Sequence, residues 1–394
     1  MKSQNHTLSL LTCLLATWSL VAPSVQAATI DWDGSDSTAW ATGANWVGGT
    51  APANDLTTDI ANFNLATYGG NPVFAPSTPG DHSISGITIG GSNGAMTIST
   101  TTGTSRLRIG ANGITIAAGA GAFTLGALNS HGASLRASQT WTNNSSSLAT
   151  VASITTTAAN TLTFAGSGTG GHKLLSRIDN GVSVVVDLPS GTVEFAGTTT
   201  NTYTGNTTVS AGTLLITNSS NQGTGTGSVS VGASGTLGGS GFVTANGTSK
   251  TVSIDGILMG GNGTAATGAA LRVTSTGGIS LNDNSVIKLT LGASNAHTSI
   301  DFTGNAGGIT FDSNQAFTFI NAQEGTYQNI LVNVGVDPGT TGTWLVTNSG
   351  YTGVFEYDGA NIDLTLTAIP EPSTWALLAL GFIAALALRR RRQA

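Results

Sequence analysis

The fold of this chain is indicated most clearly by the short stretch Ala211-Gly212-Thr213-Leu214-Leu215. Its order of glycine, then threonine or isoleucine, then spaced apolar residues recurs along the chain. The clearest copies, at spacings of 21, 23, 21 and 22 residues, begin at Gly191, Gly212, Gly235, Gly256 and Gly278. Looser copies begin at Gly86, Gly113 and Gly308. A near-constant period of this length is typical of a solenoid, whose units bury their apolar sides against one another.

We therefore expect an all-β protein, a right-handed parallel β-helix with repeats over residues 81–310. Threonine and β-branched residues suit the strands, and glycine suits corners because it adopts a positive φ without a Cβ penalty. Gly212 and Gly235 are expected to be corner glycines of this kind. The alternative fold is an antiparallel β-sandwich, but strands of such a sandwich usually recur every 8–12 residues or so.

Two further β regions are expected to flank the repeats, an N-terminal cap at 28–80 and a C-terminal region at 311–368. The cap region contains Trp32, Trp40 and Trp46 within 15 residues. Aromatic side chains would close the open, apolar end of a solenoid. The alternative is that sugars stack on the indole faces.

The composition suits many short strands joined by glycine turns. Glycine accounts for 55 of the 394 residues, and only 8% of the residues are charged, against about 25% in an ordinary globular protein. Residues 28–371 contain eight basic and nineteen acidic residues. Because no basic patch is available to neutralise phosphates, nucleic acid is not an expected partner.

The N-terminus has the pattern of a signal peptide, assigned to residues 1–27. Lys2 precedes an apolar segment at 8–21, and small residues end the segment at Ala27. A signal peptidase would cut between Ala27 and Ala28.

The C-terminus combines a proline motif, an apolar helix and a basic end. The motif is Pro370-Glu371-Pro372, the expected transmembrane helix spans 373–388, and the chain closes with Arg389, Arg390, Arg391 and Arg392. Proline stiffens an extended segment, and the arginines would hold their end of the helix in the cytoplasm as a membrane stop. The unbroken apolar run 375–388 makes roughly 21 Å of helix, short of the ~30 Å hydrocarbon core, so a buried core helix is the alternative.

This C-terminal order, over residues 369–394, resembles the PEP-CTERM sorting signal of bacterial exported proteins. The resemblance implies that a membrane-embedded exosortase cuts near Pro370-Glu371-Pro372. The chain would be anchored transiently in the inner membrane and would then reach the cell surface or the extracellular matrix.

A second resemblance covers residues 191–241. The run Asn201-Thr202-Tyr203-Thr204-Gly205, followed by Thr207-Thr208-Val209 and by the glycine stretch quoted above, is similar to the autotransporter-associated β-strand repeat. This family implies a β-helical surface stalk. Residues 160–166 look like a partial copy without the Tyr-Thr-Gly half.

The sequence offers little for catalysis or metal binding. The one cysteine, Cys13, lies in the signal peptide, so the mature chain should contain no disulfide, thiolate metal site or cysteine nucleophile. A lipoprotein site at Cys13 is the alternative, which Thr12 and the continuing apolar run oppose. The aspartates of the cap region do not match a calcium loop, because the position that should close the loop is Thr42.

Histidines and acids also lack a catalytic arrangement. The mature histidines, most of which are expected in surface turns, are His82, His131, His172 and His297. The acids of the central body are Asp179, Asp187 and Glu194, whose spacings of 8 and 7 residues do not match one coil. We therefore expect no catalytic residue, no metal and no cofactor.

The sequence thus predicts an exported, non-enzymatic surface or matrix protein with a structural or adhesin-like role. Its expected partners are an exosortase, the membrane before processing, and extracellular polysaccharide as a candidate. The alternative is a secreted glycan-binding module or a β-helical polysaccharide-active enzyme.

Overall fold

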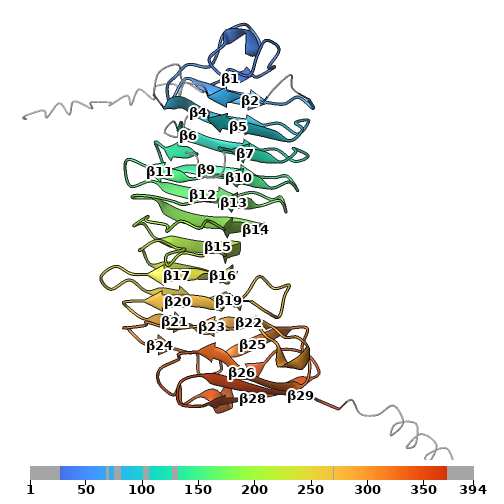
Figure 1. The fold of residues 1–394 in the computed structure, drawn as a ribbon, viewed down its shortest axis with the longest axis vertical. Helices are drawn as coiled ribbons and strands as arrows, with labels where there is room; N and C mark the ends of the chain where they lie inside the picture. Colours follow the sequence, from blue (N-terminus) through green and yellow to red (C-terminus); the bar gives the residue numbers. More distant parts are fainter. Residues whose placement is uncertain are drawn as a thin grey trace, which may run out of the picture.

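The computed structural model describes residues 27–67, 71–74, 81–100, 106–126, 132–268 and 270–370. These residues form an elongated, all-β, right-handed parallel β-solenoid of about ten turns (Figure 1). The predicted parallel β-helix is confirmed, and the antiparallel sandwich is wrong because the strands of the body pair in parallel. The helical segments of the described residues are short 3₁₀ turns at Gly43–Asn45, Ala293–Asn295 and Thr341–Thr343.

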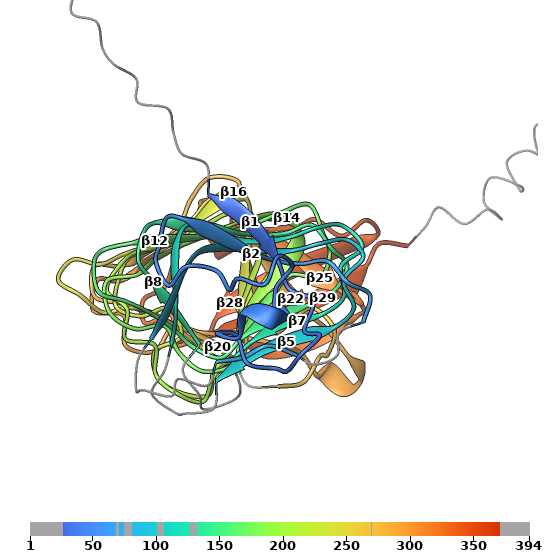
Figure 2. The same cartoon turned by 90° about the horizontal axis from the view of Figure 1, so that it is seen from above.

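The strands stack in three columns along the rod, with the turns superimposed around one axis (Figure 2). The first column contains β1 (Ala28–Asp31), β2 (Asp59–Phe63), the C-terminal parts of β4 (His82–Ile89) and β6 (Leu107–Ile116), β9 (Gln139–Asn143), β12 (Thr161–Ala165), the N-terminal parts of β14 (Ser183–Phe195), β15 (Thr207–Ile216) and β16 (Val229–Gly239), β18 (Val252–Ile254), β21 (Ile279–Leu281) and β24 (Ile309–Thr310).

The second column contains β3 (Val73–Phe74), β5 (Met96–Thr100), β7 (Phe123–Leu125), β10 (Ala149–Val151), β13 (His172–Leu174), the C-terminal parts of β14 to β16, β19 (Ile257–Gly260), β22 (Val286–Thr290), β25 (Ala316–Ile320) and β27 (Leu345–Val346). The third column contains the N-terminal parts of β4 and β6, β8 (Ala133–Leu135) and β11 (Ile154–Thr156), and, further along the rod, β17 (Phe242–Ala245), β20 (Leu271–Ser275), β23 (Ile300–Asp301) and β26 (Gly325–Val332). Parallel pairing extends beyond residues 81–310 at both ends, through β1 and β27.

The core is built from inward-facing residues that stack in register from turn to turn. In the first column, Phe164, Val186, Val209, Val231 and Ile254 are successive partners, and each is at most 1% exposed. Burying one such side chain contributes roughly 1.5–3 kcal/mol. The apolar period of the sequence is therefore the period of the core.

The glycine motif lies on two columns rather than one. The first four clear copies align in the second column, where Val193, Leu214, Leu237 and Leu258 are successive partners. The fifth copy does not continue this series, because Ile279 pairs in the first column with Val252. The turn after β19 is longer, so that Leu258 has Ile287 as its next partner.

Only one of the two expected corner glycines has a positive φ. Gly212 has φ +81°, as predicted, whereas Gly235 does not lie in the left-handed region, so the prediction for Gly235 is wrong. Gly235 is instead crowded: a Cβ there would lie 2.4 Å from the carbonyl oxygen of Val209. Close approach of neighbouring backbone therefore explains this glycine.

Polar side chains connect adjacent turns inside and outside the rod. On the outside, the hydroxyls of Thr208 and Ser230 lie 3.3 Å apart, a cross-turn pair of the type expected for threonine-rich strands. On the inside, the buried Asn201 amide accepts a hydrogen bond from the Ile178 amide and donates one to the Gly223 carbonyl. The oxygen and the nitrogen of the Asn201 side-chain amide thus form hydrogen bonds with different neighbouring turns.

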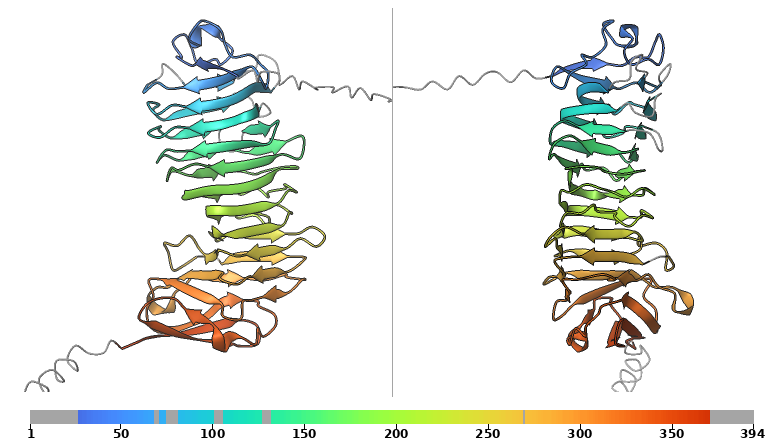
Figure 3. Two further views of the ribbon diagram at one scale, coloured as in Figure 1. Left: turned by 180° about the vertical axis from the view of Figure 1, so that it is seen from behind. Right: turned by 60° about the vertical axis from the view of Figure 1, so that its left-hand side comes forward.

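The C-terminal end of the rod is closed by the antiparallel strands β28 (Tyr351–Tyr357) and β29 (Ile362–Ala368). Figure 3 shows this end from two further sides. Phe355, Leu364 and Leu366 face the core and are buried. Most of the alternate residues of both strands, among them Glu356 and Thr365, are exposed. A polar outer face is what a solenoid needs at its last repeat to avoid end-to-end association.

Candidate functional site

The residues assigned to sorting lie at the C-terminal end of the rod. β29 ends at Ala368, the Ile369 amide donates a 2.8 Å hydrogen bond to the Gly350 carbonyl, and Pro370 is exposed. Glu371, Pro372, Arg389 to Arg392 and the expected span 373–388 lie outside the described residues. The proline motif therefore begins where the hydrogen bonding of the last strand ends.

The expected signal-cleavage position lies at the other end of the rod. Ala27 precedes β1, and Ala28 is the first residue of that strand. The Ala28 nitrogen donates a 2.8 Å hydrogen bond to the Thr58 carbonyl, and Ala28 pairs with Asp59 of β2. In the part of the chain that the structure describes, no helix is long and apolar enough to cross a membrane.

The three tryptophans form a packed cluster over the first turn of the rod. Trp32, Trp40 and Trp46 are each 1% exposed. The Trp46 ring lies edge-on to the other two indoles at centroid distances of 4.9 and 4.8 Å, and Phe63 packs against all three. Sugar stacking on these indole faces is therefore wrong, because the faces are not accessible.

Asn45 fixes the loop that carries these tryptophans. Its side chain is buried, its Oδ1 accepts hydrogen bonds from the amides of Asp36 and Ser37, and its Nδ2 donates to the Ala39 carbonyl. Trp46 Nε1 donates a 2.7 Å hydrogen bond to the Trp40 carbonyl. The cluster is thus a structural cap held by buried polar contacts.

His172 is buried in the core, and the expectation that it lies in a surface turn is wrong. It is the first residue of β13, only 4% exposed, and its ring packs against Phe164 at 5.0 Å. Lys173, the next residue, points outward and forms a 2.9 Å ion pair with Glu194. Strand alternation therefore puts the charged neighbour outside and the imidazole inside.

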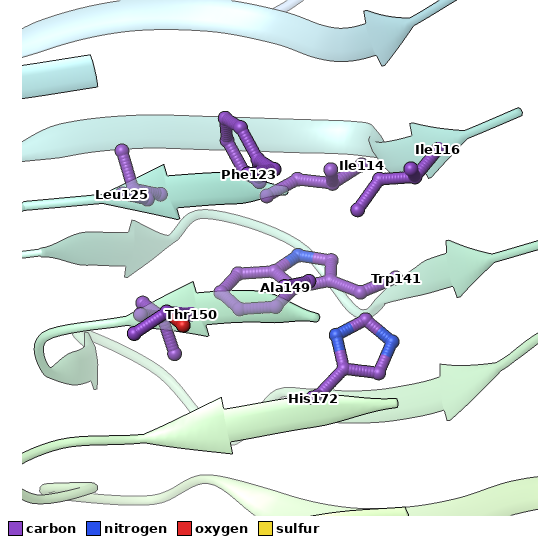
Figure 4. A pocket seen from close by; sticks show the side chains of 9 residues that line it. Ile114, Ile116, Phe123, Leu125, Trp141, Ala149, Thr150 and His172 are labelled. Atoms are coloured by element: carbon purple, nitrogen blue, oxygen red, sulfur yellow. The ribbon is translucent and has the colours of Figure 1, made fainter. Parts of the chain in front are cut away.

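The His172 imidazole borders a small cavity of about 10 Å³ whose other lining residues include Ile114, Phe123 and Trp141 (Figure 4). Among the described residues its Nε2 has no hydrogen-bond partner. Burial lowers the pKa of His172 to about 4, with a partial offset from a backbone hydrogen bond to Ala165. The cavity is too small and too apolar for a substrate.

Two of the other histidines also lie within the described residues. His82 is half-buried, and its ring meets Trp40 at 5.7 Å, so it does not lie in a surface turn either; burial lowers its pKa. His297 lies near the surface, where its Nδ1 donates a 3.0 Å hydrogen bond to the Asn295 carbonyl. His131 lies outside the described residues. The three histidines that the structure describes lie on separate strands and turns, and no two of them form a pair.

Two of the three acids of the central body are held in structural contacts. Asp179 forms a 2.8 Å ion pair with Arg177 and accepts a hydrogen bond from Thr202. Glu194, besides its contact with Lys173, accepts a hydrogen bond from the Thr217 hydroxyl. Asp187 is exposed. Within the described ranges, no group of three or more histidine, cysteine, aspartate or glutamate side chains is placed to hold a metal ion.

These features define an extended parallel β-solenoid whose candidate functional signal lies just beyond its last strand. A family model of the PEP-CTERM protein-sorting motif matches residues 368–392. The motif implies an exported protein that is processed by an exosortase and reaches the cell surface or extracellular space. No curated protein and no solved structure matches the chain.

Proposed function

We propose that this chain is a non-enzymatic surface or matrix protein whose rod-shaped body is released when an exosortase cuts near Pro370-Glu371-Pro372. The observation that carries the proposal is the position of the motif. The match begins at Ala368, the last residue of β29. Cleavage after this strand would remove the tail and leave every strand of the solenoid intact.

Residues 1–27 act as the signal peptide in this proposal, with cleavage between Ala27 and Ala28. The first hydrogen bond of the solenoid, from the Ala28 nitrogen to the Thr58 carbonyl, supports this assignment. An amino group at a new N-terminus can still donate that bond. The mature chain would therefore start at the first residue that the fold uses.

Residues 373–388 are proposed to hold the precursor in the inner membrane, with Arg389 to Arg392 as the membrane stop. An apolar helix followed by four arginines has the charge asymmetry that keeps its C-terminal end in the cytoplasm. The arginine side chains can extend toward the interface and compensate for the short apolar length. Cutting at the motif would then separate the body from its anchor.

A structural or adhesin-like role is supported by the second resemblance and by the state of the charged residues. In the segment similar to the autotransporter-associated repeat, Asn201 bridges adjacent turns and the Tyr203 hydroxyl lies 2.6 Å from Thr207 Oγ1 in the core. These motif residues have packing roles. Asp179 and Glu194 are held in ion pairs on the outer surface and are not gathered over a cavity.

Fractionation of cells that express the chain tests this proposal. Replacing Glu371 with alanine should leave the full-length protein in the membrane fraction, because the recognised charge is lost while the apolar helix remains. Glu356→Ala, which removes an exposed acid from β28, is the matched control and should be released normally. Equal release of both variants would contradict processing at the motif.

A further inference from the structure

Two adjoining hollows run along the third column in the C-terminal half of the rod. The first, of about 300 Å³, is lined by residues that include Asn221, Gln222, Asn246, Thr274, Thr276 and Gly304. The second, of about 720 Å³, is lined by residues that include Gly304, Asn305, Asn333, Val334 and Val336. Gly304 lines both hollows, so they adjoin one another, and we call the two together the trough.

The fold determines the direction of the trough. Its lining residues come from successive turns, one group beside each of β17, β20, β23 and β26. Adjacent parallel strands lie about 4.8 Å apart, so the trough extends roughly 20 Å along the rod. A ligand that fits it would be an extended chain rather than a compact molecule.

The side chains that line the trough carry no charge. None of its lining residues is an aspartate, glutamate, lysine, arginine or histidine. Arg272 of β20 and Asp301 of β23 form a 3.4 Å ion pair with each other, and neither residue lines a hollow. An anionic polymer such as a nucleic acid or a uronate would find no counter-charge among the lining side chains, so a neutral ligand is favoured.

Three amide side chains of the trough are available to a ligand. Asn221 and Asn246 are exposed and Gln222 is half-buried, and none of the three forms a side-chain hydrogen bond with another described residue. Asn305 differs, because its Oδ1 accepts from the Ser275 amide and its Nδ2 donates to the Val273 carbonyl. A free amide offers both donors and an acceptor, which matches the hydroxyl groups of sugars.

The second hollow adds an apolar surface beside these amides. Val336 is 77% exposed and Val334 lies next to it at 7%. Sugar rings present C–H groups as well as hydroxyls, so an amphipathic lining suits them. The ring of Phe302 is 1% exposed and offers no stacking face.

An extended peptide is a poorer match for the trough. Peptides that add to a sheet need a free strand edge, but β20 is already paired with β17 on one side and β23 on the other. A ligand in the trough must therefore be recognised through side chains. Glycoside cleavage generally uses two carboxylates that flank the bond, and no carboxylate lines either hollow.

We propose that the trough binds a chain of neutral sugars, a polysaccharide without carboxylate or sulfate groups, and holds it without cutting it. This inference concerns the body of the rod and does not depend on how the chain is sorted. Without a stacking aromatic ring, short oligosaccharides should bind weakly and long chains should be retained better, because many overlapping binding registers are available.

Native affinity electrophoresis tests the proposal with the full chain in a polyoxyethylene detergent. Separate gels contain dextran, glucomannan, xylan or arabinogalactan as neutral polymers, and alginate as an anionic polymer. At least one neutral polymer should retard the protein, and alginate should not. Retardation by alginate alone, or by none of the neutral polymers, would overturn the proposal.

Variants then place the binding in the trough. The triple variant Asn221→Ala/Gln222→Ala/Asn246→Ala should raise the apparent dissociation constant at least tenfold, and the nearly isosteric Asn246→Asp should weaken binding in the same direction. Asn314→Ala changes an exposed amide that lines neither hollow and should bind as the unaltered chain does. Unchanged retardation of the triple variant would overturn the proposal. So would sedimentation showing that this variant breaks a dimer, because the trough would then be a self-association surface.

Discussion

Gly212 and Gly235 are direct partners in neighbouring turns of the second column, but a methyl group would meet a different obstacle at each position. At Gly212, φ is +81° and a Cβ would lie 2.0 Å from the Leu188 carbonyl oxygen. At Gly235, the φ is permissive, and the obstacle is the Val209 carbonyl oxygen at 2.4 Å. These two paired positions therefore require glycine for different reasons, Gly212 because of its positive φ and Gly235 because of the close approach of neighbouring backbone.

Alanine substitutions at these positions should separate the two effects. Gly212→Ala should lower the free energy of unfolding by about 1–3 kcal/mol from φ strain alone, with a further loss from the contact. Gly235→Ala should cost less, because the backbone there needs no left-handed conformation. Chemical denaturation gives both values. Gly232→Ala, whose Cβ would meet nothing closer than 3.5 Å, is the matched control in the same strand and should change little. If Gly232→Ala lowered the free energy of unfolding as much as Gly212→Ala does, this explanation would be contradicted.

The buried imidazole of His172 should make the rod less stable in acid. Burial lowers its folded-state pKa to about 4 from the ordinary 6.5, so the unfolded chain binds the proton first as the pH falls. The contribution of His172 to the free energy of unfolding should therefore decrease by roughly 3 kcal/mol from about pH 6.5 down to about pH 4, and this contribution should then level off. Melting curves across this range measure the effect.

His172→Leu should remove most of the difference between the melting temperatures at pH 6.5 and pH 4. Part of the dependence should remain, because burial lowers the pKa of His82 as well and acts in the same direction. His297→Gln, a change near the surface, is the control and should retain the full dependence. If His172→Leu and His297→Gln responded to pH alike, the buried imidazole would not be the cause.

Removing the indole of Trp46 should loosen the N-terminal end of the rod. Trp46→Ala deletes a buried aromatic ring and its hydrogen bond to the Trp40 carbonyl, a change that typically costs about 3–5 kcal/mol. In a solenoid each turn contacts only its neighbours, so the loss should be local. Hydrogen exchange should accelerate in β1 and β2 and remain unchanged in β15 and β16. Val47→Ala, at a 60% exposed position, should have no such effect. Uniform acceleration along the rod would contradict a local cap.

The sequence predicts the body of the rod because one apolar period recurs where the turns have similar lengths. Phe164, Val186, Val209, Val231 and Ile254 are spaced by 22 or 23 residues and stack directly. The spacing of the glycine motif does not reveal the change at Gly278, where a longer turn moves the motif from the second column to the first. Period alone does not distinguish between columns.

The histidines and the trough show what local sequence does not reveal. His172 follows Gly171 and precedes Lys173, a polar context that suggests a surface turn. The signal for its burial was the alternation with Leu174 and the distance of 21 residues to Val193, its partner in the next turn. The trough could not be predicted, because Asn221, Asn246 and Thr276 are brought together only by the stacking of turns of unequal length.

Mass spectrometry of the protein released from cells is the decisive measurement for the proposed sorting. The released form should begin at Ala28 and end near Pro370-Glu371-Pro372, and it should contain peptides from β28 and β29. No peptide containing Trp375 or any residue of the apolar segment should be recovered from it. Recovery of Trp375-containing peptides from the released protein would show that the tail is not cut and would contradict the proposed processing.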